Sequence, residues 1–204
     1  SYDDLAAWLA RAVDTIGRTP DLLSSNSYGS SVVYRYMVNG LLPQKTRVVL
    51  ACPTPHTSHV ANALQTVSVH VPKKASWAVY NIYLGRLIRG AVVMSSHDRT
   101  AWSWFLESEK YKKATTTSQV SNVLSTLLYN DNPFTASPSL EVQRRVTVVM
   151  GARDRVVSEK ARSAMRQLLP EAKLRIVPHA GHILHFEAWR DLLPDEPGGR
   201  DMIY

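Results

Sequence analysis

Apolar residues recur every three or four positions over residues 1–17, and this spacing predicts an amphipathic helix. The apolar face is made of Leu5, Trp8, Leu9, Ala12, Val13 and Ile16. Ser1 and Asp4 have the spacing of a helix-capping pair, and Gly17 is the type of residue that commonly ends a helix. We therefore expect the chain to open with one capped helix.

Four short segments instead carry the β-branched and apolar residues that are typical of strands. They cover residues 21–25, 46–52, 146–151 and 173–177. Segment 46–52 is almost wholly apolar, as expected of a parallel strand that is covered on both faces. Helical spacing follows the first segment up to residue 40, the third at Ala161, Ala164, Met165, Leu168 and Leu169, and the fourth over residues 184–193. Alternating strands and helices predict an α/β fold with a parallel sheet.

Residues 54–140 differ from the rest of the chain in being rich in Thr, Ser and Asn. Their apolar stretches have helical spacing near residues 76–94, 100–111 and 118–129. We interpret residues 54–140 as a helical lid inserted between two parts of one core, residues 1–53 and 141–204. The aromatic side chains of the lid either line an apolar pocket or pack the lid on the core, and packing is the commoner role. They are Trp77, Tyr80, Tyr83, Trp102, Trp104 and Phe105.

The composition describes one folded domain. The chain has 204 residues, of which 45% are hydrophobic and 20% charged, so disordered, collagen-like and repeat proteins are poor matches. Cys52 is the only cysteine, which excludes an internal disulfide and favours a reducing compartment. We interpret it as a small buried apolar residue. The sequence has no bilayer-length apolar run and does not open like a signal peptide, so we expect a soluble, cytoplasmic protein without a membrane span.

The net charge of +7 raises nucleic acid as a possible partner. The basic residues are scattered along the chain, however, without interleaved aromatic residues or the Cys and His spacing of a zinc module. A solvated basic surface is the simpler interpretation, and we expect no nucleic-acid partner.

Ser27, Asp154 and His182 each follow a predicted strand within a few residues. Because parallel strands share one carboxyl edge, we expect the three side chains to meet there. A serine hydroxyl becomes a useful nucleophile when an imidazole accepts its proton, and a carboxylate orients that imidazole. Ser27 also lies at a sharp strand-to-helix turn between Ser25 and Gly29, where small residues are expected. The pattern predicts Ser27 as nucleophile, Asp154 as orienting acid and His182 as general base.

Each of these residues also has a structural explanation. Serines commonly satisfy backbone groups in turns, and an aspartate commonly precedes a helix. His179 and His185 flank His182, but no carboxylate or cysteine cluster completes a zinc spacing, so we expect neither a metal nor another cofactor. His185 is the alternative base, although we expect it in the following helix, whereas Gly181 gives the turn that places His182 at the edge.

Three stretches together resemble the α/β-hydrolase superfamily, in its lidded branch of esterases, lipases and thioesterases. Residues 22–31 are similar to the nucleophile elbow, 148–157 to the strand and turn that bear the acid, and 179–187 to the histidine loop. The resemblance covers residues 1–55 and 139–193, whereas the lid resembles no family. It implies the same roles for Ser27, Asp154 and His182, and it implies that the backbone N–H of Tyr28 is one oxyanion donor.

The sequence departs from this family pattern in two places. Ser25 stands where the G-x-S-x-G pattern has glycine, and we expect its Cβ to crowd the turn. In addition, the family has early strands and a second oxyanion donor ahead of the elbow, whereas 26 residues precede Ser27 here. We therefore expect this chain to be the carboxyl-terminal portion of a hydrolase, with the early strands supplied by a missing amino-terminal segment or by a second chain.

The predicted function is hydrolysis of an ester or thioester of a small apolar acyl substrate, by way of an acyl-enzyme on Ser27. An acyltransferase or a lyase could use the same scaffold. A third alternative, from a different class, is a ligand-binding pseudo-hydrolase that keeps the fold without turnover.

Overall fold

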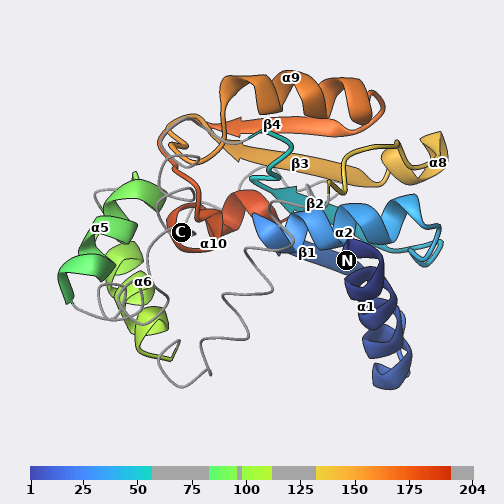
Figure 1. Cartoon of the computed structure of the whole chain (residues 1–204), viewed down its shortest axis with the longest axis horizontal. Helices are drawn as coiled ribbons and strands as arrows, with labels where there is room; N and C mark the ends of the chain where they lie inside the picture. Colours follow the sequence, from blue (N-terminus) through green and yellow to red (C-terminus); the bar gives the residue numbers. More distant parts are fainter. Residues whose placement is uncertain (57–82, 96–97, 112–131, 194–204) are drawn as a thin grey trace, which may run out of the picture.

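The computed structural model describes residues 1–56, 83–95, 98–111 and 132–193. Within them, one sheet of four parallel strands has the order β1-β2-β3-β4 (Figure 1). The strands are β1 Leu22–Asn26, β2 Arg47–Ala51, β3 Val146–Gly151 and β4 Lys173–Val177. In the register of the sheet, Ala51 lies opposite Asn26 on one side and Val149 on the other, so the strands end at one common edge. The predicted parallel α/β fold is confirmed.

The described helices follow the strands in the predicted alternation. They are α1 Tyr2–Ile16, α2 Tyr28–Val38, α5 Tyr83–Val93, α6 Arg99–Tyr111, α8 Leu140–Gln143, α9 Glu159–Leu168, α10 Leu184–Glu187 and the 3₁₀ helix η2 Trp189–Leu192. Ser1 and Asp4 cap α1 reciprocally, and Gly17 ends it at a left-handed φ of 67°. None of the described helices is both long and apolar enough to cross a membrane.

Two separate apolar clusters cover the two faces of the sheet. Residues that alternate along β2 and β3 point to opposite faces, so Val48 and Leu50 belong to one cluster and Val49 and Ala51 to the other. Side chains of α1, α2 and α9 fill the first cluster. Side chains of α10 and η2 fill the second cluster, on the opposite face of the sheet. The second face is therefore covered by the segment that directly follows the histidine loop.

Helices α5 and α6, the described helices of residues 54–140, form a third and smaller cluster. They lie on the side to which the strand arrows point (Figure 1). The ring of Phe105 on α6 contacts Phe186 on α10 at a centroid distance of 6.4 Å, edge to face, and it contacts Trp102 at 6.0 Å. These aromatic residues pack α6 against α10. Trp77, Tyr80 and the predicted helix at residues 118–129 lie outside the described residues.

The predicted helix over residues 184–193 is wrong in one respect, because α10 and η2 are separate. Ala188 leaves the helical region, with φ −155° and ψ 45°, and ends α10. The guanidinium of Arg175 on β4 donates to the carbonyl oxygen of Asp191 at 2.7 Å, which holds η2 against the sheet. Local spacing favours one continuous helix, whereas the structure has two short helices, of which η2 is held by this tertiary contact.

Candidate active site

Three predicted side chains meet at the carboxyl edge of the sheet. Ser27 directly follows β1, Asp154 lies three residues after β3, and His182 lies five residues after β4. The Oγ of Ser27 is 2.7 Å from Nε2 of His182, and Nδ1 of His182 is 2.8 Å from Oδ2 of Asp154. The residue His182 is only 3% exposed. One imidazole therefore bridges the hydroxyl and the carboxylate in a site largely removed from water.

The backbone of Ser27 has a strained conformation that directs its side chain toward His182. Ser27 has φ 53° and ψ −117°, which non-glycine residues rarely adopt. Its N–H still donates to the carbonyl of Ala51 at 2.8 Å, as if β1 continued, while α2 begins at the next residue. Ser27 precedes α2 without capping it through its side chain, so the hydroxyl is directed to His182 instead. Strain of this kind is characteristic of functional sites.

Ser25 does not crowd the turn as the sequence led us to expect. A Cβ built on Gly29 would lie 3.7 Å from the Cβ of Ser25, which is an ordinary contact. The Ser25 hydroxyl lies 3.2 Å from the hydroxyl of Ser30 and donates to the carbonyl of Val49, also at 3.2 Å. The buried side chain of Ser25 thus ties the elbow to β2, because the turn is wide enough to hold a Cβ at both positions.

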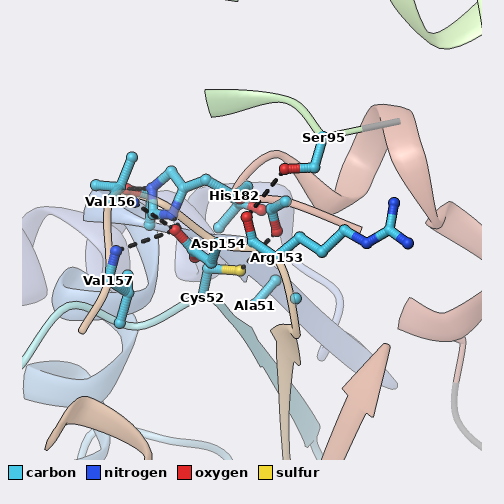
Figure 2. A network of polar contacts seen from close by, with 12 residues as sticks. Ala51, Cys52, Ser95, Arg153, Asp154, Val156, Val157 and His182 are labelled. Atoms are coloured by element: carbon cyan, nitrogen blue, oxygen red, sulfur yellow. Dashed lines mark hydrogen bonds and ion pairs between the residues drawn. The ribbon is translucent and has the colours of Figure 1, made fainter. Parts of the chain in front are cut away.

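Backbone amides and His182 hold Asp154 as a carboxylate. Burial alone would raise the pKa of Asp154, but the hydrogen bond to His182, its charge and two backbone donors outweigh burial, so the pKa is lowered. The two donors are the N–H groups of Val156 and Val157, 2.7 Å and 3.0 Å from Oδ1 (Figure 2). One oxygen of Asp154 is therefore fixed by the backbone and the other is left for His182.

The lowered pKa of Asp154 makes a testable contribution to stability. Ionised Asp154 stabilises the folded state above its ordinary pKa of 3.8, and this contribution is lost as pH falls through the lower folded-state value. The difference in unfolding free energy between wild type and Asp154→Asn should be largest above about pH 5 and shrink below about pH 4. Urea unfolding from pH 7 to pH 3 measures it, with the exposed Asp14→Asn as control. An unchanged difference down to pH 3 would contradict this account.

Gly151 lets the acid strand and the histidine loop approach each other. A Cβ built on Gly151, at the end of β3, would collide with the carbonyl oxygens of Ala180 and Gly181. The N–H of Arg153 donates to that same Ala180 oxygen at 3.0 Å, so the two loops are hydrogen-bonded where they touch. Position 151 therefore has no room for a Cβ, and only glycine fits there without movement of the backbone.

Gly151→Ala should destabilise the fold by about 3 kcal/mol or more, because rigid backbone atoms must move to admit the methyl group. Gly29→Ala is the matched control, since its Cβ meets only an ordinary contact and alanine favours a helix. It should change the unfolding free energy by less than about 1 kcal/mol. Thermal and urea unfolding of both variants measure the contrast, and equal stabilities of the two would refute it.

The other histidines of the loop lie outside this arrangement. His179 and His185 are exposed, and the hydrogen bonds to Ser27 and Asp154 are made by His182. Within the described residues, the ligand atoms of Cys52, Asp154 and His182 lie within 4.8 Å of one another, as a metal site would require. However, both ring nitrogens of His182 already contact protein groups, and burial, followed by the Asp154 charge, raises the pKa of the Cys52 thiol. His182 and Asp154 are thus already hydrogen-bonded to each other within the protein.

Sequence reasoning missed two residues beside the site. Cys52 was expected to be only a small buried apolar residue, and its burial is confirmed, but its thiol also lies beside Asp154 and 3.7 Å from the carbonyl oxygen of Gly181 (Figure 2). Its place directly after β2 was the available signal. Glu187 accepts a hydrogen bond from the N–H of Gly181 at 2.9 Å, and no local signal in the sequence indicates this contact.

The model of the Alpha/beta hydrolase family matches residues 1–195. The chain belongs to this family. A search of curated proteins found no match. The resemblance noted in the elbow, acid and histidine segments of this alpha/beta hydrolase is confirmed at the level of the family.

Several solved structures share the fold. A 2-hydroxy-6-oxo-6-phenylhexa-2,4-dienoate hydrolase from Rhodococcus sp. strain RHA1 is 15% identical with a TM-score of 0.62, over 88% of this chain and 63% of its own. A membrane phospholipase A, described as a bacterial virulence factor, is 15% identical with a TM-score of 0.66, over 92% and 59%. A meta-cleavage product hydrolase from Pseudomonas fluorescens is 14% identical with a TM-score of 0.61, over 94% and 68%. This alpha/beta hydrolase therefore spans only 59–68% of the length of these chains.

Proposed function

We propose that this protein is a serine hydrolase that cleaves an ester or thioester through Ser27, His182 and Asp154. The observation that supports the proposal most is the continuous chain of hydrogen bonds from Ser27 Oγ through the imidazole to Asp154, at 2.7 Å and 2.8 Å. Such a chain lets the imidazole take the hydroxyl proton while the carboxylate stabilises the imidazolium. The strained backbone of Ser27 adds to this support.

In the proposed reaction, His182 Nε2 accepts the proton as Ser27 Oγ attacks the acyl carbonyl carbon. The carbonyl oxygen becomes an oxyanion, and the N–H of Tyr28, the first residue of α2, is one proposed donor to it. The imidazolium then gives its proton to the leaving alcohol or thiol, and the acyl group remains on Ser27. Water deprotonated by His182 attacks this ester, and the released acid restores the serine.

We further propose that the acyl group is apolar. The lid helix α5 adjoins the site, because Ser95, two residues past α5, donates through its hydroxyl to the carbonyl of Arg153 beside Asp154. Helix α6 packs through Phe105 against Phe186 of α10, which follows the histidine loop. These helices expose large apolar side chains, with Ile88 52% and Trp104 46% exposed. Apolar surface next to a few polar groups is typical of small-molecule sites.

A second part of the proposal concerns the sheet edge beside Ser27. Among the described residues β1 pairs only with β2, and Leu22 and Leu23 of β1 are half-buried. We propose that a strand from outside the described residues, on a preceding segment or on a second chain, pairs with this edge and brings the second oxyanion donor. Native mass spectrometry of protein purified from its source tests this, since a bare 22.8 kDa monomer with full activity would oppose it.

A fluorophosphonate probe tests the proposed function. An activated Ser27 should be labelled, with labelling abolished in Ser27→Ala and slowed by an ester substrate. Absence of labelling in the folded wild type would favour the non-catalytic pseudo-hydrolase. Labelling without release of free acid, but with product formed on an added alcohol or amine, would favour the acyltransferase, and labelling without any acyl cleavage would leave the lyase.

A further inference from the structure

One carboxylate joins the lid to the histidine loop. Glu187 on α10 accepts the N–H of Gly181 through Oε2 at 2.9 Å and the N–H of Ser95 through Oε1 at 2.6 Å. Gly181 directly precedes His182, and Ser95 lies just past the carboxyl end of α5. Hydrogen bonds from N–H groups to an ionised carboxylate are about twice as strong as those between neutral groups. Glu187 thus connects two segments far apart in the sequence.

Further hydrogen bonds converge on the same junction. The N–H of His182 donates to the carbonyl of Val93 at 2.7 Å, and the hydroxyl of Ser95 donates to the carbonyl of Arg153 at 2.9 Å (Figure 2). The end of α5 therefore contacts the loop that bears Asp154 as well as the loop that bears His182. These contacts place three segments in one hydrogen-bonded unit.

The histidine loop and the end of α5 lie so close together that no Cβ fits between their backbones. A Cβ built on Gly181 would lie 2.9 Å from the amide nitrogen and hydroxyl of Ser95 and from the carbonyl oxygen of Val93. Only a glycine lets the histidine loop lie this close to the end of α5. The position of His182 is consequently set by the end of α5 and by Glu187, and not by β4 alone.

We propose that Glu187 is a positioning residue, which holds Gly181 against the end of α5 and thereby keeps the His182 imidazole within reach of Ser27 and Asp154. This inference rests on the proposed function. Glu187 acts through the backbone and touches neither the substrate nor the reacting atoms. A carboxylate is needed because it accepts both N–H groups, whereas a glutamine offers one acceptor oxygen and turns its amide N–H toward the second donor.

Glu187→Gln tests the inference in the full chain. We expect kcat per probe-labelled serine to fall about 10- to 100-fold, since small displacements of a catalytic group have effects of this size, while KM changes by less than about 3-fold. Amide hydrogen exchange of Gly181 and Ser95 should become faster than in wild type. Glu171→Gln is the matched control, because Glu171 is a surface residue paired with Arg144. It should change neither kcat nor the exchange rates of Gly181 and Ser95.

Ser95→Ala gives a second test that does not depend on the folding of the first variant. It removes only the hydroxyl bond to Arg153, and the loss of one such bond should lower kcat about 2- to 10-fold at constant KM. The inference is overturned if Glu187→Gln lowers the melting temperature but leaves kcat per labelled serine unchanged, or if Gly181 exchange stays at the wild-type rate. A wild type with neither turnover nor labelling would instead overturn the proposed function, so the two failures are distinct.

Discussion

Replacing Ser27 by alanine should lower kcat by about 10⁴-fold or more, because Ser27 Oγ is the oxygen that, among the described residues, lies within hydrogen-bonding distance of His182 Nε2. The Ser27 hydroxyl is the group 2.7 Å from Nε2 of His182, and its strained backbone holds it there. KM should change little, since the hydroxyl acts in the transition state and contributes little to binding. Steady-state hydrolysis of an activated ester measures both constants.

Ser24→Ala is the matched control for this variant. Ser24 lies on β1, three residues before Ser27, and is exposed. It should retain the wild-type kcat. Turnover by Ser27→Ala within about 10-fold of wild type would show that the reaction uses a different nucleophile.

Asp154→Asn should lower kcat by about 10⁴-fold with little change in overall geometry. The amide oxygen of asparagine can replace Oδ1 as acceptor for the N–H groups of Val156 and Val157. Its NH₂ group must then face Nδ1 of His182, which fixes the imidazole tautomer with its proton on Nε2. In that tautomer Nε2 donates to Ser27 and cannot accept its proton.

Measurement of kcat in Asp154→Asn, with the exposed Asp14→Asn alongside, checks this expectation. A fall of less than about 10-fold would mean that Asp154 is only a structural turn residue. The crystal structure of the variant would separate the two causes of a large loss. An unmoved His182 ring indicates the wrong tautomer, and a displaced ring indicates lost orientation.

The fold was predictable where local sequence and tertiary structure agree. The bounds of β3 and β4 match the predicted strands. The continuous apolar and β-branched run of β3 is typical of a strand buried inside an α/β sheet, whereas β4, at the end of the described strand order, is marked by its alternation of apolar and basic residues. The first helix matched because its apolar spacing and its Ser1 and Asp4 cap are both local signals. Ser27, Asp154 and His182 could be placed at one edge from the order of strands, since parallel strands share their carboxyl ends.

The rest depends on contacts that no local pattern encodes. Ala188 divides the last helix because Arg175 holds Asp191 against β4. Glu187 contacts Ser95, which lies 92 positions away in the sequence, and no local pattern near either residue indicates this contact. Cys52 was predicted to be buried at a strand end, and this place was a signal for the carboxyl edge, but its contact with Asp154 in particular depends on the pairing of β2 with β3.

The central claim, that Ser27 carries the acyl group, can be tested by trapping the intermediate. The protein is mixed with an excess of an activated ester, quenched in acid during turnover, digested and analysed by mass spectrometry. The account predicts the acyl mass on the peptide that contains Ser27, and its disappearance when the substrate is exhausted. Turnover with an unmodified Ser27 peptide, or with the acyl group on another residue, would contradict it.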